Sequence, residues 1–431
     1  MKKIQNIPDP VYKRVIIVGG GFAGLKLSRC LLKSGYQIVL LDQNNYHQFQ
    51  PLLYQVATAG LEPSAISFPF RRLLQNHKRA HFRIAELQKI DSNKKKVFTN
   101  IGSIEYDFLV IATGLTTNFF GMKNIAEKAL TMKSVSDALF IRNTILQNYE
   151  AALNTLDKHN KEAYLNIVIV GGGPTGVELA GAIAEMKNFI LPKDYPELDF
   201  SLMSIYLFEA SPKVLGSMLE KSSVKAKAYL EKLGVKVKTE TVVKDFDGKN
   251  VLLSDGKKHL TFNLVWSAGV TATIFDGIDK DRIGTGGRIL VNRFNEIEGY
   301  KNVYAIGDIA LMKTEKFPSG HPQVAQTAIQ QAENLGNNLR KMKVGKPSKV
   351  FKYRDKGSLA TIGRHLAVAD LGIFKFQGYL AWLLWSLVHV MSIVGVKNKL
   401  LVLIDWSWNY FTYDPGLRLM IKPKGKTKST I

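Results

Sequence analysis

The sequence predicts an α/β protein with two Rossmann-like dinucleotide-binding domains and a C-terminal amphipathic helical segment. An apolar strand run leads into glycines spaced G-x-G-x-x-G at Gly19 and again at Gly171, which predicts the two domains. Residues 376–396 contain no Asp, Glu, Lys or Arg, and basic residues gather around them. This third observation predicts the C-terminal segment.

The first glycine motif stands in the sequence context that nucleotide binding requires. Residues 14–18 form a strand run, residues 25–32 are helix-like, and residues 38–42 form a second strand that ends in a carboxylate. In such units the glycines allow a tight turn, an approach of the backbone to a pyrophosphate, and close helix packing, while the acid accepts ribose hydroxyls. The expected contacts are Gly19, Gly21, Phe22, Ala23, Gly24 and Asp42.

The second motif repeats the first. A strand run at 165–170 leads into Gly171, Gly173 and Gly176, and the next strand, 204–209, ends in Glu209. A glutamate at this position accepts bonds from both ribose hydroxyls and repels a 2′-phosphate, so NADH is favoured over NADPH. The expected contacts are Gly171, Gly173, Pro174, Thr175, Gly176 and Glu209.

Further ligand contacts are expected where other segments end. Residues 45–60 mix aromatics and amides without helical or strand periodicity and are expected to form a loop, with Gln55 as a contact. Buried strands end at Ala112-Thr113-Gly114, at Ala268-Gly269 and at Gly307-Asp308, and ligands of parallel sheets lie at such ends.

The segments between these motifs are expected to be helical or extended as follows. The pattern predicts helices over 133–161 and 321–335, and in the latter Gln326 and Gln330 share one face because they are four residues apart. Strands are expected within 235–268, 287–292 and 302–308. Residues 186–202 contain Pro192 and Pro196 and are expected to be a loop insertion without an assigned role.

Charge and cysteine content limit the classes of function that the chain can have. The 431 residues carry a net charge of +23, and from Arg340 onward there are 17 Lys and Arg against 4 Asp and Glu, which predicts an anionic partner. The N-terminus has no apolar region of a signal peptide, so the catalytic face is expected to be cytoplasmic. Cys30 is the only cysteine, so an internal disulfide and C-x-x-C chemistry are excluded. No metal site is predicted.

The apolar segment 376–396 is long enough to span a bilayer, but its details favour the membrane surface. Gln377, His389 and Ser392 interrupt it, and its tryptophans lie in its middle rather than at its ends. An amphipathic stretch, 400–411, follows two lysines. Interfacial helices fit this pattern better than a spanning pair. Buried core or dimer helices remain open.

With these residues in place, the chain resembles the type II NADH:quinone oxidoreductases, within the flavoproteins that have two dinucleotide-binding domains. The resemblance covers nearly the whole chain. It rests on the paired glycine motifs, the 46–60 segment, Ala112-Thr-Gly114, Ala305-Ile-Gly-Asp308, and Ala325-Gln-Thr-Ala-Ile-Gln330, which is similar to that family's A-Q-x-A-x-Q quinone-site pattern.

The resemblance implies an FAD-binding domain, an inserted NADH-binding domain and a membrane-association segment, at residues 1–125 with 275–345, 126–274 and 346–431. It implies non-covalent FAD, with NADH as substrate. FAD contacts are expected at Gly19, Gly21, Phe22, Ala23, Gly24, Asp42, Gln55, Ala112, Thr113, Gly114, Gly307, Asp308, Ala325 and Gln326. NADH contacts are expected at Gly171, Gly173, Pro174, Thr175, Gly176, Glu178, Glu209, Ala268 and Gly269.

The resemblance also implies the reaction and its residues. Hydride passes from NADH to FAD, and two electrons then reduce a membrane quinone. Glu178 is implied to lie near the meeting point of nicotinamide and flavin, and Gln326 and Gln330 are implied to hold the quinone head. No string of acids in spanning helices is visible, so no ion pumping is expected. The expected location is the cytoplasmic face of the bacterial inner membrane, as a peripheral, monotopic protein.

Two other functions stay open at this stage. A soluble flavoprotein reductase that passes electrons to a protein acceptor needs no cysteine, but it leaves the Trp-rich C-terminus unexplained. A nucleotide-sensing, nucleic-acid-binding flavoprotein would use the positive charge, but the basic excess adjoins apolar segments and no nucleic-acid motif. The expected partners are therefore a membrane quinone and an anionic membrane surface, without nucleic acid, and a homodimer is left open.

Overall fold

The chain is divided into two compact units, each assembled from three stretches of sequence. The computed structural model describes residues 2–273, 275–412 and 416–420. Unit 1 consists of Met1–Gln48, Phe68–Thr116 and Val270–Lys356, and unit 2 of Phe49–Ser67, Thr117–Gly269 and Gly357–Ile431. The chain therefore enters and leaves each unit repeatedly, which brings segments far apart in sequence into one fold.

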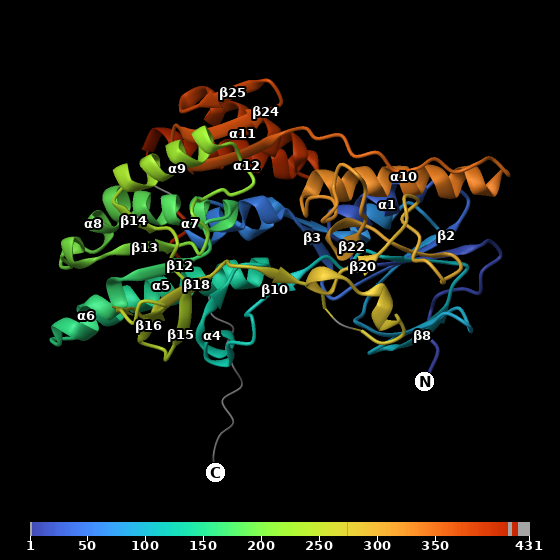
Figure 1. Cartoon of the computed structure of the whole chain (residues 1–431), viewed down its shortest axis with the longest axis horizontal. Helices are drawn as coiled ribbons and strands as arrows, with labels where there is room; N and C mark the ends of the chain where they lie inside the picture. The colour runs from blue at the N-terminus through green and yellow to red at the C-terminus, as the bar shows by residue number, and fades with distance from the viewer. Residues whose placement is uncertain (1, 274, 413–415, 421–431) are drawn as a thin grey trace, which may run out of the picture. The chain divides into compact units, whose positions relative to one another are not determined.

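Unit 1 is built on a parallel five-stranded sheet with the order β21-β9-β1-β2-β5. These strands are β21 (Val303–Ala305), β9 (Phe108–Ile111), β1 (Arg14–Val18), β2 (Gln37–Asp42) and β5 (Ala80–Ile84). Every residue of β1 is buried, as is typical of parallel sheets covered on both faces. The helices α1 (Phe22–Leu31) and α10 (Ala325–Lys343) lie side by side (Figure 1).

The smaller elements of unit 1 complete it. An antiparallel sheet is formed by β6 (Leu87–Asp91), β7 (Lys96–Thr99) and β8 (Gly102–Glu105). The others are β3 (Tyr46–Gln48), α3 (Phe70–Leu74), η5 (Lys280–Arg282), η6 (Thr285–Gly287), β20 (Ile289–Leu290), η7 (Gly307–Ile309) and β22 (Ala310–Leu311). Where the chain passes between the units there are β4 (Ser67–Pro69), β10 (Thr116–Thr117) and β19 (Val270–Thr271).

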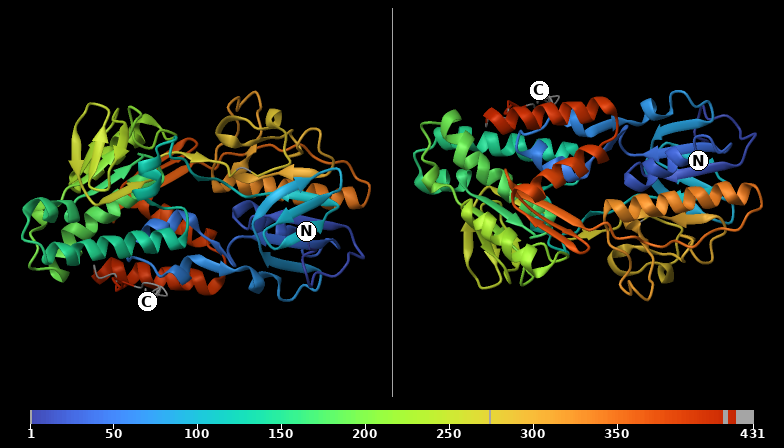
Figure 2. Two further views of the ribbon diagram at one scale, coloured as in Figure 1. Left: turned by 90° about the horizontal axis from the view of Figure 1, so that it is seen from below. Right: turned by 90° about the horizontal axis from the view of Figure 1, so that it is seen from above.

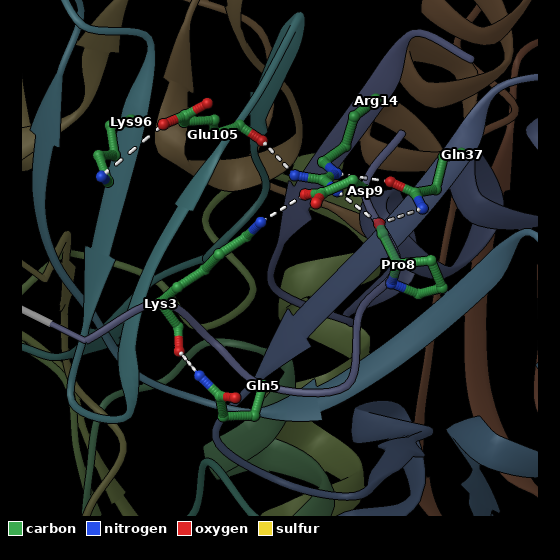
Figure 3. Close-up of polar contacts among 8 residues, drawn as sticks. All are labelled: Lys3, Gln5, Pro8, Asp9, Arg14, Gln37, Lys96 and Glu105. Atoms are coloured by element: carbon green, nitrogen blue, oxygen red, sulfur yellow. Dashed lines mark hydrogen bonds and ion pairs between the residues drawn. The ribbon is translucent and has the colours of Figure 1, made fainter. Parts of the chain in front are cut away.

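A buried arginine fastens the N-terminal segment to the sheet of unit 1. The guanidinium of Arg14, at the start of β1, donates to Gln37 Oε1 at 2.5 Å and to the carbonyl oxygens of Pro8 and Glu105 at 2.8 and 3.2 Å (Figure 3). Gln37 Nε2 donates to the same Pro8 carbonyl. Because its donors have partners, the cation is tolerated at 2% exposure.

Unit 2 repeats the parallel five-stranded design, with the order β11-β18-β12-β13-β14. These strands are β11 (Leu130–Thr131), β18 (Asn263–Trp266), β12 (Ile167–Val170), β13 (Ile205–Phe208) and β14 (Val235–Lys238). An antiparallel sheet is formed by β15 (Val243–Phe246), β16 (Asn250–Leu253) and β17 (Lys258–Leu260). Helices of its central stretch include α4 (Lys123–Lys128), α5 (Val135–Leu153), α6 (Lys158–Leu165), α7 (Pro174–Glu185) and α9 (Glu220–Lys232).

The last stretch of the chain is an integral part of unit 2. It contains an antiparallel sheet of β23 (Ser358–Gly363), β24 (Leu366–Leu371) and β25 (Phe374–Gln377), then α11 (Tyr379–Ser392) and α12 (Val396–Thr412). Strand β23 packs on α7, and β24 packs on α9 and α11. Among the described residues, no helix combines the length and apolar composition that crossing a bilayer requires.

A short segment from the N-terminal part of the chain joins unit 2 as well. It contains η1 (Gln50–Leu52), α2 (Leu53–Ala57) and η2 (Pro63–Ile66). Helix α2 packs on α5 and α7, and α12 packs on η2. Figure 2 shows this blue segment lying among the green helices and the red C-terminal helices.

Three expectations about local structure were wrong. Residues 186–202 are mostly helical, as η3 (Met186–Ile190), a π-helix, α8 (Leu191–Asp194) and η4 (Phe200–Leu202). Pro192 is compatible with α8 because it lies in the first turn, where a proline removes no helical hydrogen bond. Residues 46–60 contain α2 rather than a continuous loop, and the apolar segment begins in β25 before α11.

A glycine in α7 sets how closely this helix approaches β23. A Cβ added to Gly181 would lie 1.5 Å from the carbonyl oxygen of Ile362. Glycine to alanine inside a helix ordinarily stabilises by up to about 1 kcal/mol. At this position the contact with the Ile362 carbonyl makes the same substitution destabilising.

We expect Gly181→Ala to destabilise the protein by about 1–3 kcal/mol, because overpacking separates α7 from β23. Thermal unfolding of the purified variant measures the change. Gly216→Ala is the matched control, since no atom lies within 4 Å of its added Cβ. An unchanged or higher unfolding temperature for Gly181→Ala would contradict the described packing.

Candidate functional site

The first glycine of each motif makes the turn from strand to helix. Gly19 and Gly171 have φ values of +100° and +107°, which favour glycine. An added Cβ would lie 2.3 Å from the carbonyl oxygen of Ala112 at Gly19, and 2.8 Å from the amide nitrogen of Ala268 at Gly171. The structure therefore places each motif beside a strand end that the sequence singled out.

The third glycine of each motif closes the same turn. A Cβ on Gly24 would lie 1.8 Å from the carbonyl oxygen of Gly19, and a Cβ on Gly176 would lie 1.9 Å from that of Gly171. No side chain fits at either position. The helices α1 and α7 can therefore start directly against their strands.

The second glycine of each motif leaves space instead. No atom lies within 4 Å of a Cβ added to Gly21 or Gly173, and these residues directly precede α1 and α7. No side chain caps either helix, so each helix N-terminus faces an open approach. A helix N-terminus of this kind attracts a phosphate group.

An acid at the end of the next strand holds each glycine loop. Asp42 accepts hydrogen bonds from the amides of Gly20, at 2.6 Å, and Asn44, at 2.7 Å. In unit 2, Glu209 accepts from the amides of Gly172 and Ser211. Burial raises the pKa of Asp42 above its usual value, although the two amide bonds oppose this.

Three residues that the sequence did not single out support the first motif and the Gly307 turn beside it. The ring of Phe70 lies 2.1 Å from a Cβ added to Gly20, so only glycine fits there. His47 Nδ1 donates to the carbonyl oxygen of Gly20 at 3.0 Å, and burial lowers its pKa to about 4, which keeps it neutral. Gln331 Oε1 accepts from the amide of Gly307 at 2.7 Å.

The residues of both motifs fit a dinucleotide. Each loop combines an open second glycine, a helix N-terminus and a carboxylate at the next strand end. In unit 1, Thr113 Oγ1 is buried without a hydrogen-bond partner among the described residues, beside the Gly19 turn. A hydroxyl placed there can bond to a ligand.

Gln326 and Gln330 hold a neighbouring segment of unit 1. Gln326 Oε1 accepts from the amide of Lys356 at 2.9 Å. The amide of Gln330 exchanges two bonds with the backbone of Arg354, at 2.9 and 3.0 Å. The helix α10 begins at Ala325, so the two glutamines lie in its first two turns and share a face, as expected. Their role toward a quinone stays a prediction.

Unit 2 contains a cavity of about 170 Å³ that Glu178 lines. Aromatic and polar side chains form most of its wall. The lining residues are Tyr54, Gln55, Thr58, Gly60, Glu178, Ala182, Glu185, Met186, Ile190, Thr361, Ile362, Gly363, Arg364, Trp382, Trp385, Trp406, Asn409 and Tyr410. Burial raises the pKa of Glu178 to about 8 and that of Glu185 to about 7.

Gln55, expected as an FAD contact, lies in this cavity of unit 2. Its Nε2 donates to the hydroxyl of Tyr54 at 2.8 Å, and its Oε1 accepts from Trp406 Nε1 at 2.7 Å. It therefore connects α2 with α12. Within the part of the chain that the structure describes, no three His, Cys, Asp or Glu side chains are grouped as a metal would need.

Comparisons with known proteins identify the family of the chain. Residues 13–332 match the family model described as pyridine nucleotide-disulphide oxidoreductase, and residues 356–412 match the NDH2 C-terminal domain. The chain is 35% identical to the type II NADH:quinone oxidoreductase NdhA of Mycobacterium tuberculosis, over 92% of this chain and 87% of that protein.

Two other similarities extend the comparison. The chain is 29% identical to the type II NADH:quinone oxidoreductase of Staphylococcus saprophyticus, over 85% of this chain and 91% of that protein. In fold, it is similar to NDH2 from Plasmodium falciparum in complex with NADH, with a TM-score of 0.85 and 23% identity. That match covers 95% of this chain and the whole of the other. The α/β dinucleotide-binding fold is thus confirmed.

Substitution of the second glycine, which has open space around it, and of the third glycine, which has none, should have different effects. We expect Gly21→Ala to fold normally but to bind FAD at least about tenfold more weakly, because its methyl group occupies the approach of the pyrophosphate. We expect Gly24→Ala to destabilise the FAD-free protein, because its Cβ meets the Gly19 carbonyl. Thermal unfolding and FAD titration measure both. Unchanged FAD affinity in Gly21→Ala would refute the binding mode.

Proposed function

The chain belongs to the type II NADH:quinone oxidoreductases, and we propose how its two units divide the reaction that transfers two electrons from NADH through FAD to a quinone. The duplicated glycine cradle carries this proposal, because each cradle offers one helix N-terminus and one carboxylate to one dinucleotide. Single-dinucleotide proteins need only one such cradle.

We assign FAD to the cradle of unit 1 and NADH to that of unit 2. FAD, when bound, supplies the chemistry of accepting hydride and releasing two electrons. In unit 1 the amides near Gly21 would hold the pyrophosphate and Asp42 the ribose. In unit 2 Gly173 and Glu209 would do the same for NADH. Thr113 Oγ1, buried and unpaired among the described residues, supports a ligand contact beside the first cradle.

Gln326 and Gln330 are proposed to hold the quinone head, with Glu178 acting on the nicotinamide side. The two glutamines share one face of α10, so their amides can serve one ligand. Their bonds to residues 354–356 keep that face in place. Glu178 is buried at 7% exposure in the second turn of α7, the helix that starts at the NADH cradle.

A C-terminal apolar face supports membrane association. It consists of exposed large apolar side chains on α11 and α12, namely Tyr379, Leu380, Leu383, Leu387, Val388, Met391, Val396, Leu400, Leu403, Ile404, Trp408 and Phe411. The opposite side of α12 is tied to unit 2, since Asn398 Nδ2 donates to the carbonyl oxygens of Ser64, Ala65 and Ser67. Exposed apolar side chains gathered on two consecutive helices in this way indicate an interaction surface.

We therefore propose a peripheral, monotopic enzyme on the cytoplasmic face of the inner membrane, with the C-terminal apolar face on the lipid. Quinones dissolve in lipid, so this placement brings the enzyme to its acceptor. A soluble reductase with a protein acceptor would leave the face unused, and the same face could serve a homodimer instead. The lysines at 422, 424, 426 and 428 lie outside the described residues.

NADH-driven reduction of a short-chain quinone by the purified, FAD-loaded protein tests the proposed function. We expect NADH to be strongly preferred over NADPH, because the Glu209 carboxylate repels a 2′-phosphate. Glu209→Gln keeps an acceptor for the loop amides but removes the charge, and should raise kcat/KM for NADPH relative to NADH by about tenfold. A wild-type preference for NADPH would overturn the assignment.

The membrane face has its own test. Truncation before residue 357 is unsuitable, because β23, β24 and α11 belong to the fold of unit 2. The double variant Leu403→Asn and Trp408→Asn should instead lose flotation with anionic vesicles while keeping its unfolding temperature. Val224→Asn, at an exposed position of α9, is the matched control. Full flotation of the double variant would contradict the proposed face.

A further inference from the structure

Two acids of α7 line one cavity but differ in their access to water. Glu178 and Glu185 are seven residues apart, so they lie on one face of the helix about 10 Å apart along its axis. Glu178 is buried, whereas Glu185 is only half-buried. The cavity therefore runs from an acid with contact to solvent to an acid without it.

The cavity that holds the two acids offers several polar groups and has room for water. The hydroxyl of Tyr54 accepts from Gln55 Nε2, which leaves its own hydrogen available for donation. Trp385 also lines the cavity, and its buried indole Nε1–H lies near the Glu178 carboxyl group. A volume of about 170 Å³ holds roughly five waters at ~30 Å³ each.

Few charged groups act on these acids. The amide of Arg364 donates to Glu185 Oε1, and the positive charge of that arginine opposes the rise in the pKa of Glu185. The backbone amide of Thr361, from β23, and the side chain of Trp385, from α11, both act to lower the pKa of Glu178. Tyr54 from α2 faces both acids, and Tyr410 from α12 adds a second phenol to the wall. Burial is therefore the largest influence on the pKa of both acids. It raises each pKa into the neutral range, so both acids can gain and lose a proton near neutral pH.

The reaction requires a proton from water. In NADH + H⁺ + quinone → NAD⁺ + quinol, the nicotinamide C4–H bond breaks and two quinol O–H bonds form. Hydride supplies both electrons and one hydrogen nucleus, so the second hydrogen of the quinol enters as a proton. An enzyme that excludes water from its reacting groups needs a route for that proton.

We propose that Glu185 takes up this proton at the solvent end of the cavity and passes it to Glu178 through the Tyr54 hydroxyl and cavity water. The inference rests on the proposed function and adds Glu185 to it as a proton carrier. Each transfer breaks one O–H bond and forms another. Glu178 then gives the proton to the quinol that forms, so both acids return to their starting states in every turnover. The carrier is regenerated by a proton from bulk water.

Glu185→Gln tests the proposal in the full, FAD-loaded protein. We expect NADH:quinone turnover at pH 7.5 to fall at least about tenfold, while stopped-flow reduction of the flavin by NADH keeps its rate, because hydride transfer needs no proton from water. Wild-type turnover should decrease as pH rises through about 7, because the protonated fraction of Glu185 decreases. This titration step should vanish in the variant.

Two further variants and one spectroscopic readout separate this role from a structural one. Glu185→Asp should restore part of the turnover, and Gly363→Ala should slow it, because the added Cβ would lie 2.8 Å from Glu185 Oε1. Glu231→Gln, at an exposed position of α9, is the control. Infrared spectra should show a protonated carboxyl band that titrates near pH 7 in the wild type and is absent in Glu185→Gln.

The outcomes are distinguishable. An active wild type whose turnover and pH profile are unchanged in Glu185→Gln overturns the proton route alone. A wild type that bleaches its flavin with NADH but does not reduce quinone overturns the proposed function. If Glu185→Gln does not fold, the pH profiles of Glu185→Asp and Gly363→Ala decide, since an unshifted profile in both contradicts the proposal.

Discussion

Both units depend on one steric constraint, the contact between the carbonyl of the first glycine and the Cα of the third glycine in each motif. In unit 1 Gly24 meets Gly19, and in unit 2 Gly176 meets Gly171, at nearly the same distance from an added Cβ. The contact lets a helix start directly against a parallel strand. The open second glycine and the acid bound to the loop follow from that geometry, and together they form a place for a pyrophosphate and a ribose.

The C-terminal stretch has two functions in unit 2. Its buried side supplies β23, against which Gly181 packs, and Trp385 and Trp406, which line the cavity of Glu178. Its outer side carries the C-terminal apolar face. Because the same helix α12 contacts the cavity and carries that face, the proposed membrane attachment and the cavity share a structural element. An anchor that folded separately from unit 2 would not share a helix with the cavity.

The sequence predicted the repeated units well, because their chemistry is local. Strand, glycine turn, helix and terminal acid follow one another within about 30 residues in the first unit and about 45 in the second, so the local pattern identified Gly19 and Gly171. It could not predict the partners that arrive from elsewhere in the chain. Phe70 contacts the first loop and Gln331 the Gly307 turn through tertiary packing, and no local pattern distinguishes them from ordinary core and helix residues.

The errors have the same origin. The prolines at 192 and 196 were interpreted as loop signals, yet the first lies where a helix tolerates it. The partners of Gln55 could not be predicted from its amide-rich surroundings, since it bonds to Tyr54 and to Trp406, which is 351 residues away in sequence. Its contact with the flavin stays a prediction. Glu185 carried no signal at all, since its significance comes from sharing a cavity with Glu178.

The central claim is that this chain takes electrons from NADH and delivers them to a quinone through bound FAD. An anaerobic absorption spectrum of the purified protein tests it most directly. The account predicts a flavin band that one equivalent of NADH bleaches and one equivalent of quinone restores. A protein without a flavin band, or a band that NADH leaves unchanged, would contradict the account.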